Sequence, residues 1–178
     1  MTRRSTSTST IRTQGALLPS DLLDRVRAGD AKLEGASGKT YGLPSGIRLS
    51  DAISTSWNTL RQHWADFQKA RQEHGENLPG TEITRTQWLA PLFYQLGFGE
   101  LKKQTAPVID EKTYPIERFW GDSVPMHWVG YNIPIDRRTK GVRGAALASP
   151  HSLVQEYLNR SDDHLWAIVT NGLQLRLL

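Results

Sequence analysis

Residues 149–178 have the sequence SPHSLVQEYLNRSDDHLWAIVTNGLQLRLL, which predicts a helix, a strand, a tight turn and a second strand. Ser149 can cap a helix that has Pro150 at its first position, where the missing N–H of proline costs nothing. Asn171-Gly172 tolerates the positive φ angles of a two-residue turn between strands over residues 165–170 and 173–178. The last strand ends without a polar tail, so we expect the chain to be the front part of a longer protein.

The composition indicates one modest globular core. The chain has 178 residues, 38% of them hydrophobic, with six tryptophans and a formal net charge of +4. This small positive excess favours an anionic partner such as nucleic acid, but it is also common in proteins that bind none. Cysteine is absent, which fits a reducing cytoplasm, and no stretch approaches the about 18 apolar residues of a membrane helix. We therefore expect a cytoplasmic protein that does not associate with membranes.

The predicted organisation is a tail, a helical region and a sheet region. Residues 1–15 are rich in Ser and Thr and predict a disordered tail. Residues 16–98 predict helices near 17–26, 50–72 and 84–96, the second with a buried stripe of Ile53, Trp57, Leu60, Trp64 and Phe67. Residues 99–178 predict strands within 100–109, 112–120 and 124–135 before the closing helix and hairpin. The fold class is α+β or α/β, with one mixed sheet.

Two details of the third helix matter for its start. Thr84-Arg85-Thr86-Gln87 has the pattern of a capping box, which places the first turn there. Pro91 lies inside the same helix, where it predicts a kink or a later start. Gly97 ends the element.

The chain has no compact catalytic signature. Its five histidines are scattered without the i, i+4 pairing of a helical zinc site, and no G-x-S-x-G nucleophile elbow is present. We therefore assign no metal site to these histidines. The order of the elements is more informative than any single motif.

That order resembles the N-terminal nuclease-type region of restriction enzymes in the PD-(D/E)XK superfamily. The matching features are LFYQLGF at residues 92–98, then strands, then a helix with Gln155-x-Tyr157, then a strand ending in Thr-Asn-Gly. More closely, LPSDLLDR (18–25), AISTSWNTLR (52–61), DRRTKGVRGAA (136–146) and residues 148–178 resemble the leading region of large type IIG-like adenine-specific DNA methyltransferases of bacterial restriction and phage-defence systems. The resemblance covers most of the chain after the tail.

The resemblance implies a Mg²⁺ site made of an Asp, an acidic-x-Lys on the next strand and a Gln on the following helix. Gln155 fills the last position, and Asp136-x-Arg138 stands where acidic-x-Lys is expected. Arginine cannot shuttle a proton, because its pKa exceeds about 12. Asp110-Glu111-Lys112 spells acidic-x-Lys, but it falls in a predicted turn one strand too early. Asp136 and Gln155 are thus the catalytic candidates only if the domain is an active nuclease.

A basic loop follows Asp136. Four cations fall within a Gly-containing stretch, and they are candidates for contact with DNA phosphates: Arg137, Arg138, Lys140 and Arg143. The alternative is a solvated loop with an internal salt bridge to Asp136. Both interpretations stay open at this point.

Three functions follow from these observations. The first is a non-catalytic, degenerate nuclease-like module that contacts DNA or joins the parent methyltransferase to other defence subunits. The second is an active Mg²⁺-dependent endonuclease, and the third is a protein-interaction platform without nucleic-acid binding. No methyltransferase motif is present in the sequence, so the resemblance implies S-adenosylmethionine only in another part of the parent enzyme. Within this chain we expect no cofactor, apart from Mg²⁺ in the second case.

Overall fold

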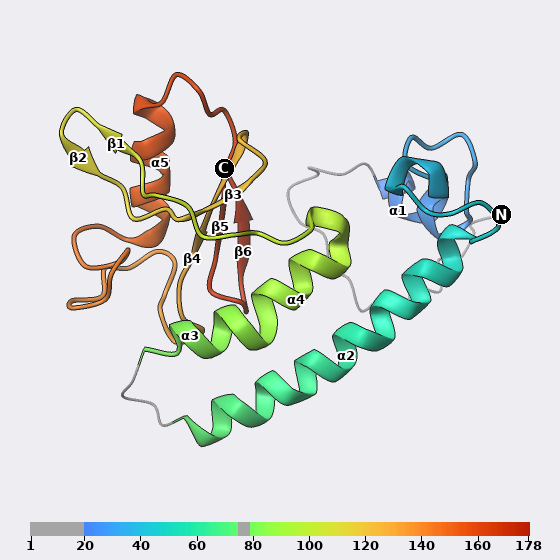
Figure 1. Ribbon diagram of the computed structural model, residues 1–178, viewed down its shortest axis with the longest axis horizontal. Helices are drawn as coiled ribbons and strands as arrows, with labels where there is room; N and C mark the ends of the chain where they lie inside the picture. Colours follow the sequence, from blue (N-terminus) through green and yellow to red (C-terminus); the bar gives the residue numbers. More distant parts are fainter. Residues whose placement is uncertain (1–19, 75–78) are drawn as a thin grey trace, which may run out of the picture. The chain divides into compact units, whose positions relative to one another are not determined.

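The computed structural model describes residues 20–74 and 79–178, and the tail predicted over residues 1–15 lies outside them (Figure 1). The chain divides into two compact units, residues 1–53 and 54–178. Helix α2 (Leu49–Glu73) begins in the first unit and continues into the second. Its bounds confirm the predicted helix over residues 50–72.

The described part of the first unit has few buried side chains. It has helix α1 (Ser20–Arg27), close to its predicted position, and a short 3₁₀ helix, η1 (Gly38–Tyr41). The turn after α1 is held by an ion pair between Arg25 Nε and Asp30 Oδ2 at 2.9 Å. Within residues 21–53, no side chain is fully buried.

The second unit contains a four-stranded mixed sheet, which confirms the predicted mixture of helices and sheet. Its strands are β3 (Arg118–Trp120), β4 (Val124–Trp128), β5 (Ile168–Thr170) and β6 (Leu175–Leu177), in that spatial order. Strand β4 is antiparallel to β3 and parallel to β5, and β5 is antiparallel to β6. The parallel pair requires a crossover, and helix α5 (Pro150–Arg160) provides it.

Helix α5 covers one face of the sheet (Figure 1). Ser149 caps it as predicted, because its Oγ accepts a hydrogen bond from the Ser152 N–H at 3.1 Å. One hydrophobic cluster joins α5 to the sheet and to the segment before β3: Tyr114, Ile116, Phe119, Ile135, Leu153, Val154, Tyr157, Ala167 and Val169.

A second helical layer covers the opposite face. It is one continuous element over residues 81–98, made of α3 (Thr81–Ile83), η2 (Thr84–Leu89), α4 (Ala90–Phe93) and η3 (Tyr94–Phe98), and we call it the 81–98 helix. Leu89 and Phe93 pack there against Met126 and Ile168. Because Ile168 and Val169 are consecutive in β5, their side chains point to opposite faces, and the sheet lies between two helical layers.

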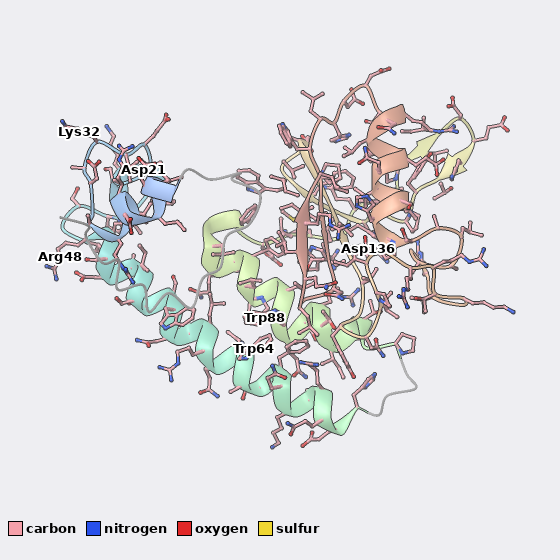
Figure 2. The ribbon with its side chains drawn as sticks, turned by 180° about the vertical axis from the view of Figure 1, so that it is seen from behind. Asp21, Lys32, Arg48, Trp64, Trp88 and Asp136 are labelled. Atoms are coloured by element: carbon pink, nitrogen blue, oxygen red, sulfur yellow. The ribbon has the colours of Figure 1, made fainter. Side chains whose placement is uncertain are left out.

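Helix α2 packs on the 81–98 helix through aromatic side chains. The rings of Trp64 and Trp88 meet edge to face at 4.8 Å between the two helices (Figure 2), and Phe67 is fully buried beside them. The predicted buried stripe is wrong at its N-terminal end, since Ile53 and Trp57 are 58% and 62% exposed. Spacing placed these side chains on one face, but the packing partners begin only near Leu60.

The 81–98 helix starts three residues earlier than the capping-box pattern predicts. Thr84 lies inside the helix, and its hydroxyl donates to the Gly80 carbonyl at 2.7 Å instead of capping a first turn. Pro91 is accommodated because the turns before it are π-helical, a form in which the usual i→i−4 bonds are already interrupted. Gly97 has a φ of 89° and ends the regular helix as predicted.

The strands are shorter than the sequence predicts. Residues 100–107 form no strand, and a separate two-stranded hairpin consists of β1 (Val108–Ile109) and β2 (Lys112–Thr113). Asp110 and Glu111 form its turn with φ angles of 48° and 63°. The closing hairpin is present, but four residues, 171–174, connect its strands. Asn171 Oδ1 holds this loop by accepting hydrogen bonds from the N–H groups of Leu173 and Gln174. The predicted two-residue turn is therefore wrong.

Candidate functional site

Asp136 lies in a loop and not at the end of a strand. Strand β4 ends at Trp128, eight residues earlier, because residues 129–149 form the long connection to α5. The Asp136 carboxylate makes two bonds to the guanidinium of Arg176 in β6, at 2.6 and 3.1 Å. This pairing holds the pKa of Asp136 below its usual range. Figure 2 shows Asp136 beside the sheet, where it fastens the start of the loop.

The other carboxylate and amide candidates do not complete a metal site. Gln155 is exposed on α5 and donates to Asn159 Oδ1 at 3.1 Å. Asp110 lies at the tip of the β1–β2 hairpin, where Arg160 Nη1 approaches its Oδ2 at 3.4 Å. Across residues 20–74 and 79–178, no group of three acidic or histidine side chains is arranged to hold a metal ion. The residues implied by the resemblance thus do not fit a Mg²⁺ centre.

The cations of the basic loop, residues 136–144, differ in whether they form an ion pair. Arg137, Arg138 and Lys140 are exposed, and within the described part of the chain none of them forms an ion pair. Arg143 instead bonds through Nη2 to Glu117 Oε1 at 2.5 Å. The alternative interpretation expected Asp136 to form a salt bridge within the loop. Asp136 does form a salt bridge, but its partner is Arg176 of β6 and not a cation of the loop.

The basic loop is held to β4 by a buried histidine. His127 is 3% exposed, and its Nε2 donates to the Gly144 carbonyl at 2.9 Å. Burial lowers the pKa of His127, so the ring is neutral at physiological pH. Gly144 has a φ of 82°, and a Cβ there would lie 2.5 Å from His127 Cε1. Only glycine therefore allows this close approach.

Four cations from four chain segments line a recess of about 210 Å³, which we call the basic recess. They are Arg85 of the 81–98 helix, Lys103 of the following segment, Arg118 of β3 and Arg143 of the basic loop. Glu117 lies among them and pairs with both Lys103 Nζ, at 3.2 Å, and Arg143. Trp128 forms part of the wall, with the Arg118 guanidinium 5.6 Å from its ring centre. A shallower groove continues from Lys103, Glu117 and Arg143 towards Thr113.

Hydrogen bonds hold the chain segments that carry three of these cations. Lys103 forms a β-bridge to Arg118, and the Gln104 N–H donates to the Glu117 carbonyl at 2.9 Å. The 81–98 helix is held against the end of β4 because Thr84 Oγ1 also accepts the Tyr131 N–H, at 2.9 Å. This contact positions the turn that carries Arg85.

Sequence reasoning found Arg143 but missed Arg85, Lys103 and Arg118. These three residues belong to no shared motif, and they meet only because the 81–98 helix, the segment after it and β3 are folded together. The only local signal for any of them was Arg118, a basic residue at the start of the short apolar strand β3. That signal does not distinguish a binding residue from a solvated one.

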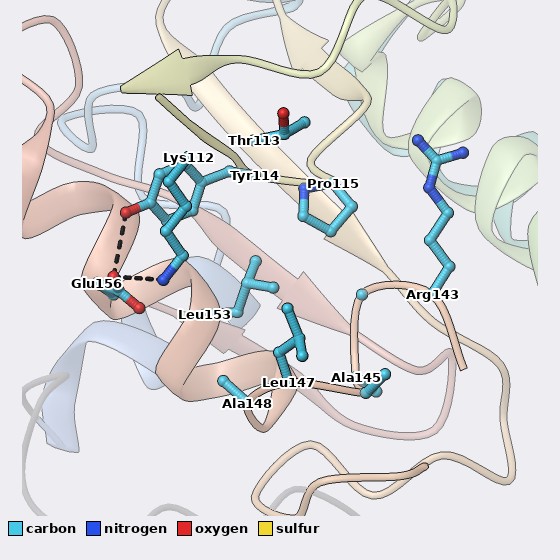
Figure 3. Close-up of a pocket in the computed structure, with 12 residues that line it drawn as sticks. Lys112, Thr113, Tyr114, Pro115, Arg143, Ala145, Leu147, Ala148, Leu153 and Glu156 are labelled. Carbon is cyan, nitrogen blue, oxygen red and sulfur yellow. Dashed lines mark hydrogen bonds and ion pairs between the residues drawn. The ribbon is translucent and has the colours of Figure 1, made fainter. Parts of the chain in front are cut away.

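A second cavity, of about 270 Å³, lies on the other side of Arg143 (Figure 3). Its walls come from residues 112–115, from 143–148 and from α5, and they are mainly apolar. At one end, Lys112 Nζ bonds Glu156 Oε1 at 2.6 Å, and the Tyr114 hydroxyl donates to the same oxygen at 3.2 Å. The bond from Lys112 lowers the pKa of Glu156, and burial raises the pKa of Tyr114. Glu156 is thus engaged in fastening the β1–β2 hairpin to α5.

Comparisons with protein-family models, with curated proteins and with solved structures find no match to this chain. The resemblance to restriction methyltransferases accordingly stays a prediction from the motifs. In the part of the chain that the structure describes, no helix combines the length and the apolar character needed to cross a bilayer.

Proposed function

We propose that this chain is a non-catalytic DNA-contacting module of a bacterial restriction or phage-defence methyltransferase. The observation that carries the proposal is the exposed trio Arg137, Arg138 and Lys140 on a loop that the fold holds in place. Exposed cations on an ordered loop can follow a phosphate backbone, and they carry no sequence preference of their own. The motif resemblance is the reason for proposing a methyltransferase as the parent enzyme. It also implies a cytoplasmic location and an S-adenosylmethionine site outside this region.

The state of the nuclease candidates supports a positioning role. Asp136 is bound by Arg176 on both oxygens, and Gln155 is directed to Asn159. A carboxylate paired in this way is a poor Mg²⁺ ligand, because the metal would have to displace a bidentate guanidinium. In the proposed module the β-strand and α5 framework of a nuclease is retained as a platform for the basic loop.

Charge reversal in the basic loop tests the proposal. The variant carries Arg137→Glu and Arg138→Glu, and affinity for a short DNA duplex is measured by fluorescence anisotropy across a range of salt concentrations. If both arginines contact phosphates, affinity falls for every duplex sequence, and the slope of log K against log salt drops by roughly two, about one per lost contact. Arg143 is left unchanged, since its reversal would place two acids beside each other at Glu117.

The matched control reverses two exposed cations outside the basic loop that form no ion pair within the described residues, with Arg61→Glu on α2 and Lys39→Glu on η1. It makes the same change in net charge away from the basic loop. Retained affinity in the control together with lost affinity in the loop variant supports the proposal. Equal losses would mean that only net charge matters, and unchanged affinity in both would remove DNA contact by this loop.

A further inference from the structure

Arg118 is the least compensated charge of the basic recess. Its side chain is half-buried, its Nε is covered without a hydrogen-bond partner, and Nη1 has only a long contact of 3.4 Å to the Glu117 carbonyl. Within the described residues, no carboxylate lies within ion-pair distance of Arg118, although Glu117 is its neighbour in sequence. A partly covered guanidinium with an unpaired Nε and no paired anion gains from a ligand that supplies the missing charge and hydrogen bond.

The surroundings of Arg118 increase this deficit. Burial and the positive charge of Arg85 lower the pKa of Arg118, and the more distant carboxylates of Glu117 and Glu82 offset this only in part. Two guanidinium groups are thus held near each other on the wall of one recess. An anion between them would offset both the repulsion and the lost hydration.

The charge count indicates which anion fits. Four cations line the recess, Glu117 pairs with two of them, and Glu82 pairs with Arg85. Four positive and two negative charges leave a net charge of +2 around a space of about 210 Å³. A phosphate monoester carries about −1.5 to −2 at pH 7, and its oxygens match the guanidinium fork, whereas a carboxylate carries only one charge.

We infer that the basic recess binds a phosphate monoester, with Arg118 and Arg85 as its principal partners and Lys103 and Arg143 at the rim. A terminal phosphate projects from a strand end or a free nucleotide and can enter a recess, whereas an internal phosphodiester is flanked by sugars on both sides. The recess lies next to the basic loop through Arg143. The inference does not need the loop to bind DNA, and different variants test the two proposals.

Inorganic phosphate is the first probe, titrated into the full chain at constant ionic strength with chloride as the balancing anion. The readout is the indole N–H signal of Trp128 in a two-dimensional ¹H–¹⁵N spectrum, identified with Trp128→Phe. We expect a saturable shift of this signal. Removal of one charged hydrogen-bonding partner costs a factor of about ten or more, so Arg118→Gln should weaken phosphate binding by at least that much.

Arg61→Gln is the matched control, because it makes the same substitution at an exposed arginine on α2 that belongs neither to the recess nor to the basic loop, and it should leave phosphate binding unchanged. If Arg118→Gln fails to fold, Lys103→Gln takes its place, since Lys103 is 56% exposed and tolerates change. This variant should weaken binding several-fold. A Trp128 signal that does not move, or that moves equally in wild type and in the folded recess variant, overturns the inference.

Competition separates the two sources of the phosphate. A 5′-phosphorylated oligonucleotide, the same strand with a 5′-hydroxyl, and adenosine 5′-monophosphate are each tested against bound inorganic phosphate. Preference for the phosphorylated strand assigns the site to a strand end, and equal competition by the nucleotide assigns it to free phosphate monoesters. Failure of both phosphorylated ligands to compete overturns the inference, even where loop-dependent DNA binding persists.

Discussion

His127 connects the interior of the sheet to the basic loop through one hydrogen bond. Its ring is neutral in the fold, because burial depresses its pKa below the ordinary value of 6.5. The unfolded chain binds a proton at this histidine below pH 6.5, whereas the folded chain resists it. The stabilisation is therefore complete above pH 6.5 and declines as the pH falls from there towards the folded-state pKa.

This linkage predicts a specific pH dependence. As the pH falls from 6.5 towards the folded-state pKa, His127 should reduce the free energy of unfolding by up to about 1.4 kcal/mol per pH unit. His127→Gln keeps a donor for the Gly144 carbonyl but cannot titrate, so its stability should fall less steeply over this interval. Urea unfolding at several pH values measures the two slopes. His63→Gln on α2 is the control, and a slope that stays the same in His127→Gln would contradict the prediction.

At the residue scale, ion pairs were the hardest features to predict. Asp136 stood beside three cations of its own loop, yet its partner is Arg176, 40 residues away. Sequence proximity favours local pairs, but the loop turns the Asp136 carboxylate towards β6. The same holds for Glu117 and Arg143, which are joined only by the packing of the loop against the start of β3.

At the scale of the element, the attachment of the 81–98 helix to the sheet depends on one buried hydroxyl, that of Thr84. Thr84 is fully buried, donates to the Gly80 carbonyl and accepts the Tyr131 N–H. Thr84→Val keeps the shape and removes both bonds, which leaves a covered N–H without a partner and should cost about 2 kcal/mol. The free energy of urea unfolding measures this loss.

Thr86→Val supplies the comparison on the same helix. The Thr86 hydroxyl also bonds a backbone carbonyl, that of Glu82, but the side chain is exposed and water can replace the bond. Its change in stability should stay within about 0.5 kcal/mol. Equal costs for the two valine variants would show that the Tyr131 contact contributes nothing.

Elements with local signals were predicted well, and elements with distant partners were not. Ser149 and Pro150 define the start of α5 through adjacent backbone groups, so their pattern was sufficient. The 81–98 helix starts at Thr81 and not at the capping-box threonine, because Thr84 is needed by Tyr131, 47 residues away. Strand was also expected over residues 100–107 and 129–135, but both stretches are loops, and in the second the apolar side chains of Val129, Ile133 and Ile135 are buried from a loop.

At the scale of the whole molecule, the described hydrophobic core lies in the second unit. All three clusters of buried apolar side chains fall within residues 89–169. A chain that begins at Ser54 keeps the sheet, both helical layers and the packing of Trp64 on Trp88. It should therefore unfold cooperatively, with a thermal midpoint close to that of the full chain, as followed by circular dichroism.

A chain that begins at Glu100 is the matching test of the helical layer. It lacks Leu89 and Phe93, so Met126 and Ile168 would be exposed on the uncovered face of the sheet. We expect no cooperative transition from this shorter chain. Cooperative unfolding of the shorter chain, or its loss in the chain from Ser54, would contradict the proposed division.

The basic recess also belongs to the whole molecule. Its cations are at positions 85, 103, 118 and 143. These positions lie too far apart in the sequence for any two of them to belong to one motif. Hydrophobic spacing could predict that helices cover a mixed sheet. It could not predict which charged residues at the borders of these elements converge, because such side chains leave no periodic signal.

The fastening of the basic loop has a consequence for the entropy of binding. Asp136 fixes the start of the loop, His127 fixes Gly144, and the Thr139 N–H donates to the Ala145 carbonyl at 2.7 Å. Ordering a flexible backbone costs about 1–2 kcal/mol per residue, and here folding has already imposed that order. Arg137, Arg138 and Lys140 therefore need to restrict only their side-chain rotamers when they meet an anion, so the loop acts as a rigid surface and not as a segment that folds on contact.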